Sequence, residues 1–174
     1  SNLTMSLTSL KKHKNLDAVI FVPLNGRTGD GLEIEKYCTE NQIFLIEDSA
    51  HALGSHYLDK NCGALGDSSV FSFTPHKIIT MGQGGMVLTD NLETYEKLIK
   101  LKTFNRAKDK SDWHEGFGLN FKITDLQSAL GLSQLSRLDS LIQKKKNIFQ
   151  YFYENLESVE MINFKEYETP WFID

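Results

Sequence analysis

Two short apolar runs constrain the fold of this chain more than any other feature. Residues 17–24 (DAVIFVPL) form a β-branched run that ends in a turn-rich stretch, which predicts a buried strand. Residues 43–46 (IFLI) predict a second strand, which stops at Glu47 and Asp48. Both runs are apolar almost throughout rather than at alternate positions, as expected of strands that helices cover on both faces.

The segment between the two strands has the spacing of an amphipathic helix. Residues 31–41 are predicted to be helical, with Asp30 as the N-cap. The apolar positions at near-helical intervals are Leu32, Ile34, Tyr37 and Cys38. A strand, a helix and a strand in this order form a βαβ unit, whose crossover is almost always right-handed and whose strands run parallel. The sequence therefore predicts an α/β protein.

Alternating strands and helices are predicted downstream as well. Strands are expected at residues 69–73 and 85–89, after a hairpin or irregular excursion at residues 54–67. Helices are expected at residues 92–102, 124–135 and 139–156, and a surface loop at residues 107–117. Asn91 or Asp90 is the expected cap of the first of these helices. With 174 residues, 40% of them hydrophobic, the chain can bury one core of ordinary domain size.

Charge and hydropathy argue against nucleic acid and membranes as partners. The net charge of −4 gives no positive field to gather nucleic acid or an anionic lipid surface. The most apolar run, residues 18–24, is far shorter than the ~20 residues that cross a bilayer. Residues 1–15 do not resemble an export signal. A cytoplasmic protein is the expectation.

The cysteines do not predict a metal centre or a disulfide framework. Cys38 and Cys62 are far apart, outside any CxxC motif and without a His-rich neighbourhood. We interpret them as two reduced, inert thiols.

Polar residues follow three of the predicted strand ends. Asp48 and His51 come after the second strand, Ser72 and Lys77 lie around the third, and a glycine-rich stretch at residues 82–85 leads into the fourth. In open parallel sheets, ligands bind at the carboxyl ends of the strands. These side chains are therefore expected to share one pocket.

The order of an aspartate and a downstream lysine suggests one specific chemistry. A pyridoxal phosphate enzyme needs a lysine to hold the cofactor as a Schiff base and a carboxylate against the pyridine nitrogen. Asp48 and Lys77 have these residue types in this order. Taken alone, a strand-end aspartate is more often a helix cap, and it can also be a metal ligand or a general base.

Two longer segments resemble a known family. Residues 46–91 (IEDSAHALGSHYLDKNCGALGDSSVFSFTPHKIITMGQGGMVLTDN) and residues 117–135 (FGLNFKITDLQSALGLSQL) resemble the DegT/StrS-type sugar aminotransferases, a fold type I pyridoxal phosphate family. The likeness spans residues 17–156. Within the family, enzymes of the perosamine synthase type, which aminate a 4-keto-6-deoxy sugar, look most similar.

The resemblance implies a specific architecture. The expected fold is a three-layer α/β/α sandwich with a mostly parallel sheet, the large domain of a fold type I aminotransferase in part. Residues 1–157 would belong to this pyridoxal phosphate-binding domain, and residues 158–174 would begin the connection to a C-terminal domain that the chain lacks. Because members of the family also have a phosphate-binding turn upstream of the matched region, the chain is expected to be a fragment.

The resemblance also assigns roles to residues around the cofactor. Lys77 would form the Schiff base and then act as the catalytic base. Asp48 would pair with the pyridine nitrogen, and His51 would lie against the ring or its phenolic oxygen. Ser72 would donate its hydroxyl to the phosphate. Asn120 would reach the phosphate of the neighbouring subunit, so that a homodimer shares its active sites.

Two departures bear on what the chain does. Lys122 stands where the family more often has arginine, so a bidentate clamp there is lost. A related branch of sugar dehydratases has histidine at the Schiff-base position, whereas this chain has Lys77. The expected reaction is therefore amino transfer from an amino acid, with glutamate as the expected donor, to a keto group of a nucleotide-linked deoxysugar. The alternatives are a dehydratase and a truncated fragment that folds or dimerises without cofactor.

Overall fold

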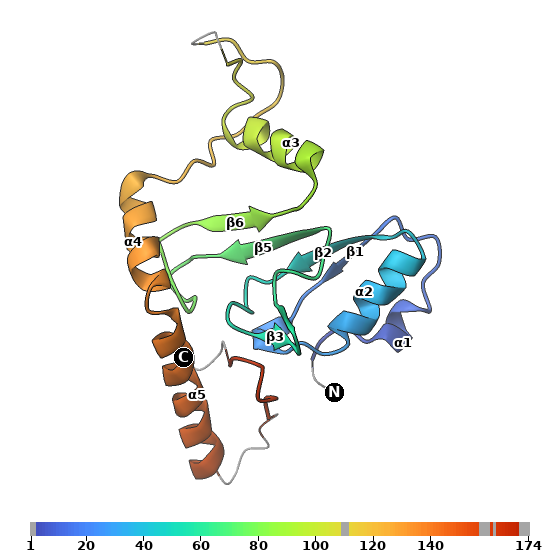
Figure 1. Ribbon diagram of the computed structural model, residues 1–174, viewed down its shortest axis with the longest axis vertical. Helices are drawn as coiled ribbons and strands as arrows, with labels where there is room; N and C mark the ends of the chain where they lie inside the picture. The colour runs from blue at the N-terminus through green and yellow to red at the C-terminus, as the bar shows by residue number, and fades with distance from the viewer. Residues whose placement is uncertain (1–2, 109–111, 157–160, 162, 171–174) are drawn as a thin grey trace.

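The described part of the chain is built on a four-stranded sheet. The computed structural model describes residues 3–108, 112–156, 161 and 163–170. The strands are β1 (Ala18–Phe21), β2 (Phe44–Asp48), β5 (Ser68–Ser72) and β6 (Gly85–Leu88), in the order β1-β2-β5-β6 (Figure 1). β1, β2 and β5 run parallel, whereas β6 is antiparallel to β5. The predicted α/β fold with a mostly parallel sheet is confirmed.

A small hairpin and several helices complete the described fold. The hairpin pairs β3 (His56–Tyr57) with β4 (Lys60–Asn61), inside the segment predicted as an excursion. The helices are α1 (Leu7–Leu10), the 3-10 turn η1 (Leu24–Gly26), α2 (Gly31–Glu40), α3 (Leu92–Lys102), α4 (Asp125–Leu135) and α5 (Leu138–Asn155). Of these, α1 and η1 were not predicted, because elements of three or four residues leave no periodic pattern to detect.

The ends of the first two strands differ from the prediction. β1 ends at Phe21, two residues before Pro23, which has no N–H to donate to a ladder. β2 continues through Glu47 and Asp48, which were expected to lie just past it. Pairing with β5 extends the strand there, because Glu47 aligns with Ser69. Both acidic residues are therefore held at fixed positions on the sheet.

The predicted helix caps are partly right. Asn91 caps α3, since its side chain accepts the Thr94 N–H at 2.8 Å. Asp30 occupies the cap position of α2 but makes no side-chain cap bond. Its carboxylate instead accepts the N–H of Leu7 at 2.9 Å, which satisfies a donor at the start of α1.

The main core lies between one face of the sheet and α2. Its side chains alternate along the strands, as a pleated sheet requires. They include Val19 and Phe21 of β1, Leu45 of β2, and Ile34 and Cys38 of α2. On the opposite face of the sheet, the described residues cover the apolar side chains only in part. Those of Ile20, Phe44 and Val87 are 42% to 57% exposed.

A second, smaller core joins the segment after β5 to α5. Phe73, Ile79 and Met81 are buried there, and Leu138 and Leu141 of α5 pack against them. In Figure 1, α4 and α5 form one column that runs past the ends of β5 and β6. The loop between these strands is therefore packed rather than free in solvent.

The last described segment returns to the hairpin. The Tyr167 carbonyl accepts the His56 N–H at 2.9 Å, and the Thr169 N–H donates to Ser55 Oγ at 2.8 Å. Glu168 accepts two hydrogen bonds from Thr28, which ties together positions 140 residues apart. The predicted domain boundary between residues 157 and 158 lies outside the described residues and stays a prediction.

Candidate active site

The carboxyl edge of the sheet brings together the first pair of predicted site residues. Asp48 is aligned with Val70 across the β2–β5 pair. Because side chains alternate along a strand, Ser72 lies on the same face as Val70 and Asp48. Glu47 lies on the other face, in the core. Asp48 and Ser72 therefore share one face of the sheet, near the carboxyl ends of two neighbouring strands, and the cofactor roles predicted for them stay predictions.

Lys77 lies in a compact loop that connects β5 to β6. The loop closes on itself through backbone hydrogen bonds from Phe73 to Gly84 (2.9 Å) and from Met81 to Phe73 (3.0 Å). Burial lowers the pKa of Lys77, and the negative charge of Asp48 raises it in part. The structure therefore places the lysine within electrostatic reach of the strand-end carboxylate, in a half-buried setting.

His51 belongs to the same cluster. Its pKa is lowered mainly by burial and further by the positive charge of Lys77, while Asp48 raises it. The turn that carries it begins at Asp48, whose Oδ1 accepts the Ala50 N–H at 3.2 Å. His51 thus senses the charges of both Lys77 and Asp48, so the three side chains lie in one neighbourhood, and their common role in a cofactor site stays a prediction.

No side chain of β6 lies beside the Ser72 hydroxyl, because the residue of β6 opposite Ser72 is a glycine. Gly85 is aligned with Ser72 across the β5–β6 pair, so a side chain there would project beside the serine hydroxyl. Ser72 Oγ also lies 3.3 Å from Thr74 Oγ1, which places two hydroxyls at the end of β5.

Asn120 and Lys122 lie on a different part of the chain. Asn120 is exposed and forms an isolated bridge with Thr103 in the segment between α3 and α4 (Figure 1). The ammonium group of Lys122 lies 5.3 Å from the centre of the Phe104 ring. The structure therefore gathers Asp48, His51, Ser72 and Lys77 but places Asn120 apart from them within one chain. Its predicted reach into a neighbouring subunit stays a prediction.

Sequence reasoning missed the residues of α4 that hold the loop between β5 and β6. This loop, residues 73–84, carries Lys77 and is called the lysine loop. Gln134 Oε1 accepts the Thr80 N–H at 2.9 Å, and Gln127 Nε2 donates to the Gln83 carbonyl at 2.9 Å. Between them on the same helix face, Gly131 is buried, and a Cβ there would lie 2.9 Å from the side chain of Met81. The spacing i, i+4, i+7 was visible in the sequence, but polar residues at that spacing do not show what they contact.

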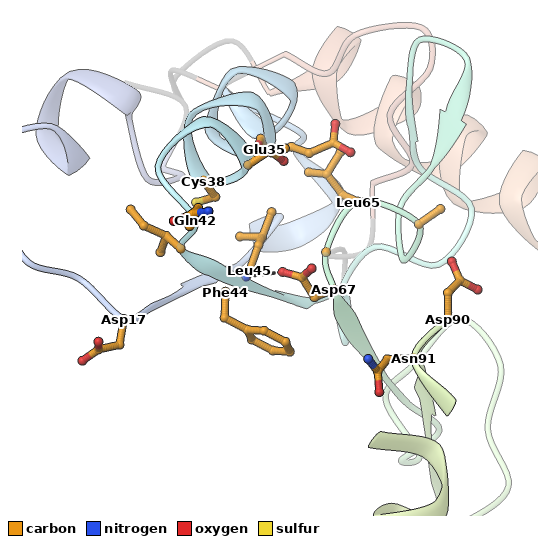
Figure 2. Close-up of a pocket in the computed structure, with 14 residues that line it drawn as sticks. Asp17, Glu35, Cys38, Gln42, Phe44, Leu45, Leu65, Asp67, Asp90 and Asn91 are labelled. Atoms are coloured by element: carbon orange, nitrogen blue, oxygen red, sulfur yellow. Dashed lines mark hydrogen bonds between the residues drawn. The ribbon is translucent and has the colours of Figure 1, made fainter. Parts of the chain in front are cut away.

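A separate pocket of about 770 Å³ lies at the other end of the parallel strands, where they begin. Asp17, Phe44, Asp67 and Asp90 line it, all at the amino ends of the parallel strands or after β6 (Figure 2). Asp67 is already engaged there, since its carboxylate accepts the Leu45 N–H at 2.7 Å. Because ligands of such sheets bind at the carboxyl ends, this pocket is not the candidate active site.

Metal-binding clusters and membrane-spanning helices are both absent from the described residues. These residues include no group of three or more metal-binding side chains, and none of their helices is long and apolar enough to cross a membrane. Cys38 and Cys62 are both buried and not bonded to each other. Burial raises the pKa of both thiols, so they stay protonated at neutral pH.

Comparison with known proteins places this geometry in a family context. Residues 6–170 match the family described as DegT/DnrJ/EryC1/StrS aminotransferases. GDP-perosamine synthase of Escherichia coli O157:H7 is 33% identical over 159 residues, which are 90% of this chain and 44% of that protein. The chain spans less than half the length of the curated relatives it matches first.

Solved structures agree with the sequence match. The structure of Helicobacter pylori PseC, an aminotransferase involved in the biosynthesis of pseudoaminic acid, has a TM-score of 0.82 and 30% identity, and the match covers 90% of this chain and 43% of that one. A GDP-4-keto-6-deoxymannose-3-dehydratase has a TM-score of 0.86 over 98% of this chain and 50% of that one, but only 22% identity, which shows the fold alone. The family match covers nearly the whole described chain, so this chain belongs to the DegT/DnrJ/EryC1/StrS aminotransferase family.

Proposed function

We propose that the protein to which this chain belongs uses pyridoxal phosphate to transfer an amino group to a keto group of a nucleotide-linked deoxysugar. The observation that carries the proposal is the position of Lys77, half-buried and within electrostatic reach of Asp48 at the carboxyl edge of the sheet. Glutamate is the proposed amino donor.

The cluster has the groups that this chemistry requires. Pyridoxal phosphate, when bound, supplies an electron-withdrawing ring that stabilises negative charge on the substrate carbon. Asp48 would keep the ring nitrogen protonated, because a carboxylate favours the charged form of a nearby base. Burial lowers the pKa of Lys77, so more of its amine is uncharged and able to accept a proton than in an exposed lysine.

The remaining residues would orient the cofactor. Ser72, with Thr74 beside it, would donate a hydroxyl to the phosphate at the end of β5. The glycine at the start of β6 leaves the adjoining edge open. His51 would lie against the ring, where its lowered pKa keeps it neutral and able to pack or donate.

The substrate class is inferred from the relatives. The related proteins include GDP-perosamine synthases and, from Campylobacter jejuni, a UDP-4-amino-4,6-dideoxy-N-acetyl-beta-L-altrosamine transaminase. Both names describe amino sugars linked to a nucleotide. We therefore propose a nucleotide-linked keto sugar as the acceptor, without a choice of nucleotide.

We also propose a homodimer with shared active sites in the cytoplasm. Phe117, Phe121 and Leu126 flank Asn120 and are 68% to 83% exposed, which favours their burial against another subunit. Asn120 would then reach the cofactor phosphate of the partner. Two buried thiols that do not pair are consistent with a reducing compartment.

A dehydratase is the second candidate, and one residue argues against it. The dehydratase neighbour shares the fold, so fold alone does not separate the two reactions. Lys77 stands where the dehydratase branch is expected to have histidine, and a lysine can both hold the cofactor covalently and, once displaced, move the proton that amino transfer requires.

The direct test is a product assay with the full-length protein. Wild type, with pyridoxal phosphate and glutamate, is expected to convert a nucleotide-linked 4-keto-6-deoxy sugar to an amino sugar and to release 2-oxoglutarate in equal amount. Lys77→Ala is expected to lose this reaction, whereas Lys36→Ala, an exposed lysine on α2, should keep it. A product that has lost a hydroxyl without gaining nitrogen would indicate the dehydratase, and an active Lys77→Ala variant would refute the proposed role of the lysine.

A further inference from the structure

Glu47 is a buried carboxylate directly next to Asp48, and the proposed mechanism gives it no role. Its side chain is 0% exposed. An isolated charge in a protein interior is costly, and it is tolerated only where hydrogen bonds replace the lost water. The surroundings of Glu47 therefore show what the residue holds in place.

Four donors converge on this carboxylate. Oε1 accepts the Ser49 hydroxyl at 2.7 Å, the Tyr57 hydroxyl at 2.9 Å and the Gly63 N–H at 2.8 Å. Oε2 accepts the Leu65 N–H at 3.0 Å. Charge-assisted bonds of this kind are about twice as strong as neutral ones, so the group acts as a fixed point.

The four donors come from separate segments of the chain. Ser49 belongs to the turn after β2, Tyr57 to the hairpin strand β3, and Gly63 and Leu65 to the stretch before β5. Burial, with the nearby Cys62 and Glu47, raises the pKa of Tyr57, so its hydroxyl stays a donor at neutral pH. One carboxylate thus joins the end of β2 to the turn that follows it, to the hairpin and to the stretch before β5.

Asp48 depends on this support. In the part of the chain that the structure describes, its carboxylate accepts a hydrogen bond only from its own turn, the Ala50 N–H at 3.2 Å. Consecutive strand residues face opposite sides, so anchoring Glu47 in the core fixes the backbone that aims Asp48 into the site. The turn continues with the Ala52 N–H donating to the Ser49 carbonyl at 3.0 Å, and His51 lies within it.

We propose that Glu47 is a positioning residue, which orients Asp48 and His51 toward the cofactor ring by fixing the strand end and the turn that carry them. The inference rests on the proposed function for the identity of the ligand. The effect of the Asp48 charge on Lys77 belongs to this chain alone, so it can be tested without cofactor.

The test compares Glu47→Gln with two other variants in the full-length protein. Asp48→Asn removes the charge that Glu47 is proposed to aim. Glu168→Gln is the matched control, because Glu168 is also a buried carboxylate and also accepts backbone N–H groups, from Thr28 and Lys165. The readouts are the pKa values of Lys77 and His51, measured by NMR on the cofactor-free protein, and the dissociation constant of pyridoxal phosphate.

Glu47→Gln is expected to act like a weaker Asp48→Asn. Asp48 raises the pKa of both Lys77 and His51, so both pKa values should fall when Asp48 is displaced. Pyridoxal phosphate should bind about tenfold more weakly or worse, by analogy with metal sites, where loss of a residue that orients a ligand costs about 10- to 100-fold in affinity. Glu168→Gln should lower the melting temperature and leave all three readouts at their wild-type values.

A folded Glu47→Gln variant with wild-type pKa values and wild-type affinity would overturn the proposal. If that variant does not fold, Ser49→Ala and Tyr57→Phe each remove one donor, and smaller shifts in the same direction are expected. Wild-type readouts in both would equally overturn it. If wild type binds no pyridoxal phosphate but the pKa values still respond, the proposed function fails and the role of Glu47 in aiming Asp48 stands.

Discussion

At the scale of single residues, the site is governed by opposing effects on a few charged groups. Burial favours neutral Lys77 and neutral His51, while Asp48 favours the charged form of each. Since a lysine must be partly neutral to act as a base or nucleophile, burial is the effect that suits the proposed chemistry. Asp48 limits how far that effect goes.

Replacement of Lys77 should be felt at His51. In Lys77→Met, the pKa of His51 is expected to rise, because the cation that lowers it is gone while burial is nearly unchanged. NMR titration of the histidine ring measures this shift. An unchanged or lowered His51 pKa would show that the two side chains do not interact.

The same coupling has a consequence for stability. Because the pKa of His51 is lower in the folded protein than in the unfolded chain, acidification through about pH 6.5 and below removes stability at this residue. The loss should be smaller in Lys77→Met, and urea unfolding at several pH values measures the difference. An equal pH dependence in both proteins would contradict the assignment.

At the scale of elements, α4 serves as the support of the lysine loop. It contacts the loop through Gln127, Gly131 and Gln134, while Leu126 and Leu130 on the same helix stay 83% and 44% exposed. The helix thus presents one face to the loop and leaves an apolar one uncovered within the described chain. Any partner that covers the apolar face would contact the support of Lys77.

Loss of one of these contacts should destabilise the protein. Gln134→Ala leaves the partly buried Thr80 N–H without its acceptor, which is expected to cost about 1–3 kcal/mol of unfolding free energy. The control is Gln143→Ala on α5, where the glutamine bonds the exposed Asn147 and the expected change is within about 0.5 kcal/mol. Urea unfolding of both variants decides, and equal losses would contradict the role given to Gln134.

The elements also show how much the sequence could predict. Apolar runs located β1, β2 and β5, and the rule that ligands bind at carboxyl ends gathered Asp48 and Lys77. The face that α4 buries was not predictable, because leucines suggest a core contact whether the neighbour is the same chain or another. The burial of Glu47 was not predictable either. It depends on donors from the hairpin and its flanks, and the packing of these segments leaves no periodic pattern in the sequence.

At the scale of the whole molecule, buried hydrogen bonds join segments that are far apart in the sequence. Glu168 is buried and accepts hydrogen bonds from the Thr28 N–H and hydroxyl at 2.8 and 2.9 Å, and from the Lys165 N–H at 2.9 Å. Thr169 adds a bond to Ser55. The segment around Glu168 thus holds the loop after β1 against the segment that leads into the hairpin.

Removal of this anchor should open the molecule locally. In Glu168→Ala, amide hydrogen exchange is expected to accelerate at Thr28, His56 and Thr169. The Thr28 N–H donates to Glu168 itself, and the other two N–H groups form the hydrogen bonds that join residues 167 and 169 to residues 55 and 56. Leu45, whose N–H donates to Asp67 in the sheet, should keep its rate. Faster exchange at all four amides would indicate global rather than local opening and contradict the anchoring role.

The most direct test of the account is whether Lys77 binds pyridoxal phosphate. Visible absorption spectra of the full-length protein with added cofactor would be recorded for wild type, Lys77→Ala and Lys36→Ala, before and after glutamate. The account predicts a visible band in wild type and Lys36→Ala that glutamate converts to near-ultraviolet absorption, and no such band in Lys77→Ala. A band that persists without Lys77, or wild type without one, would contradict it.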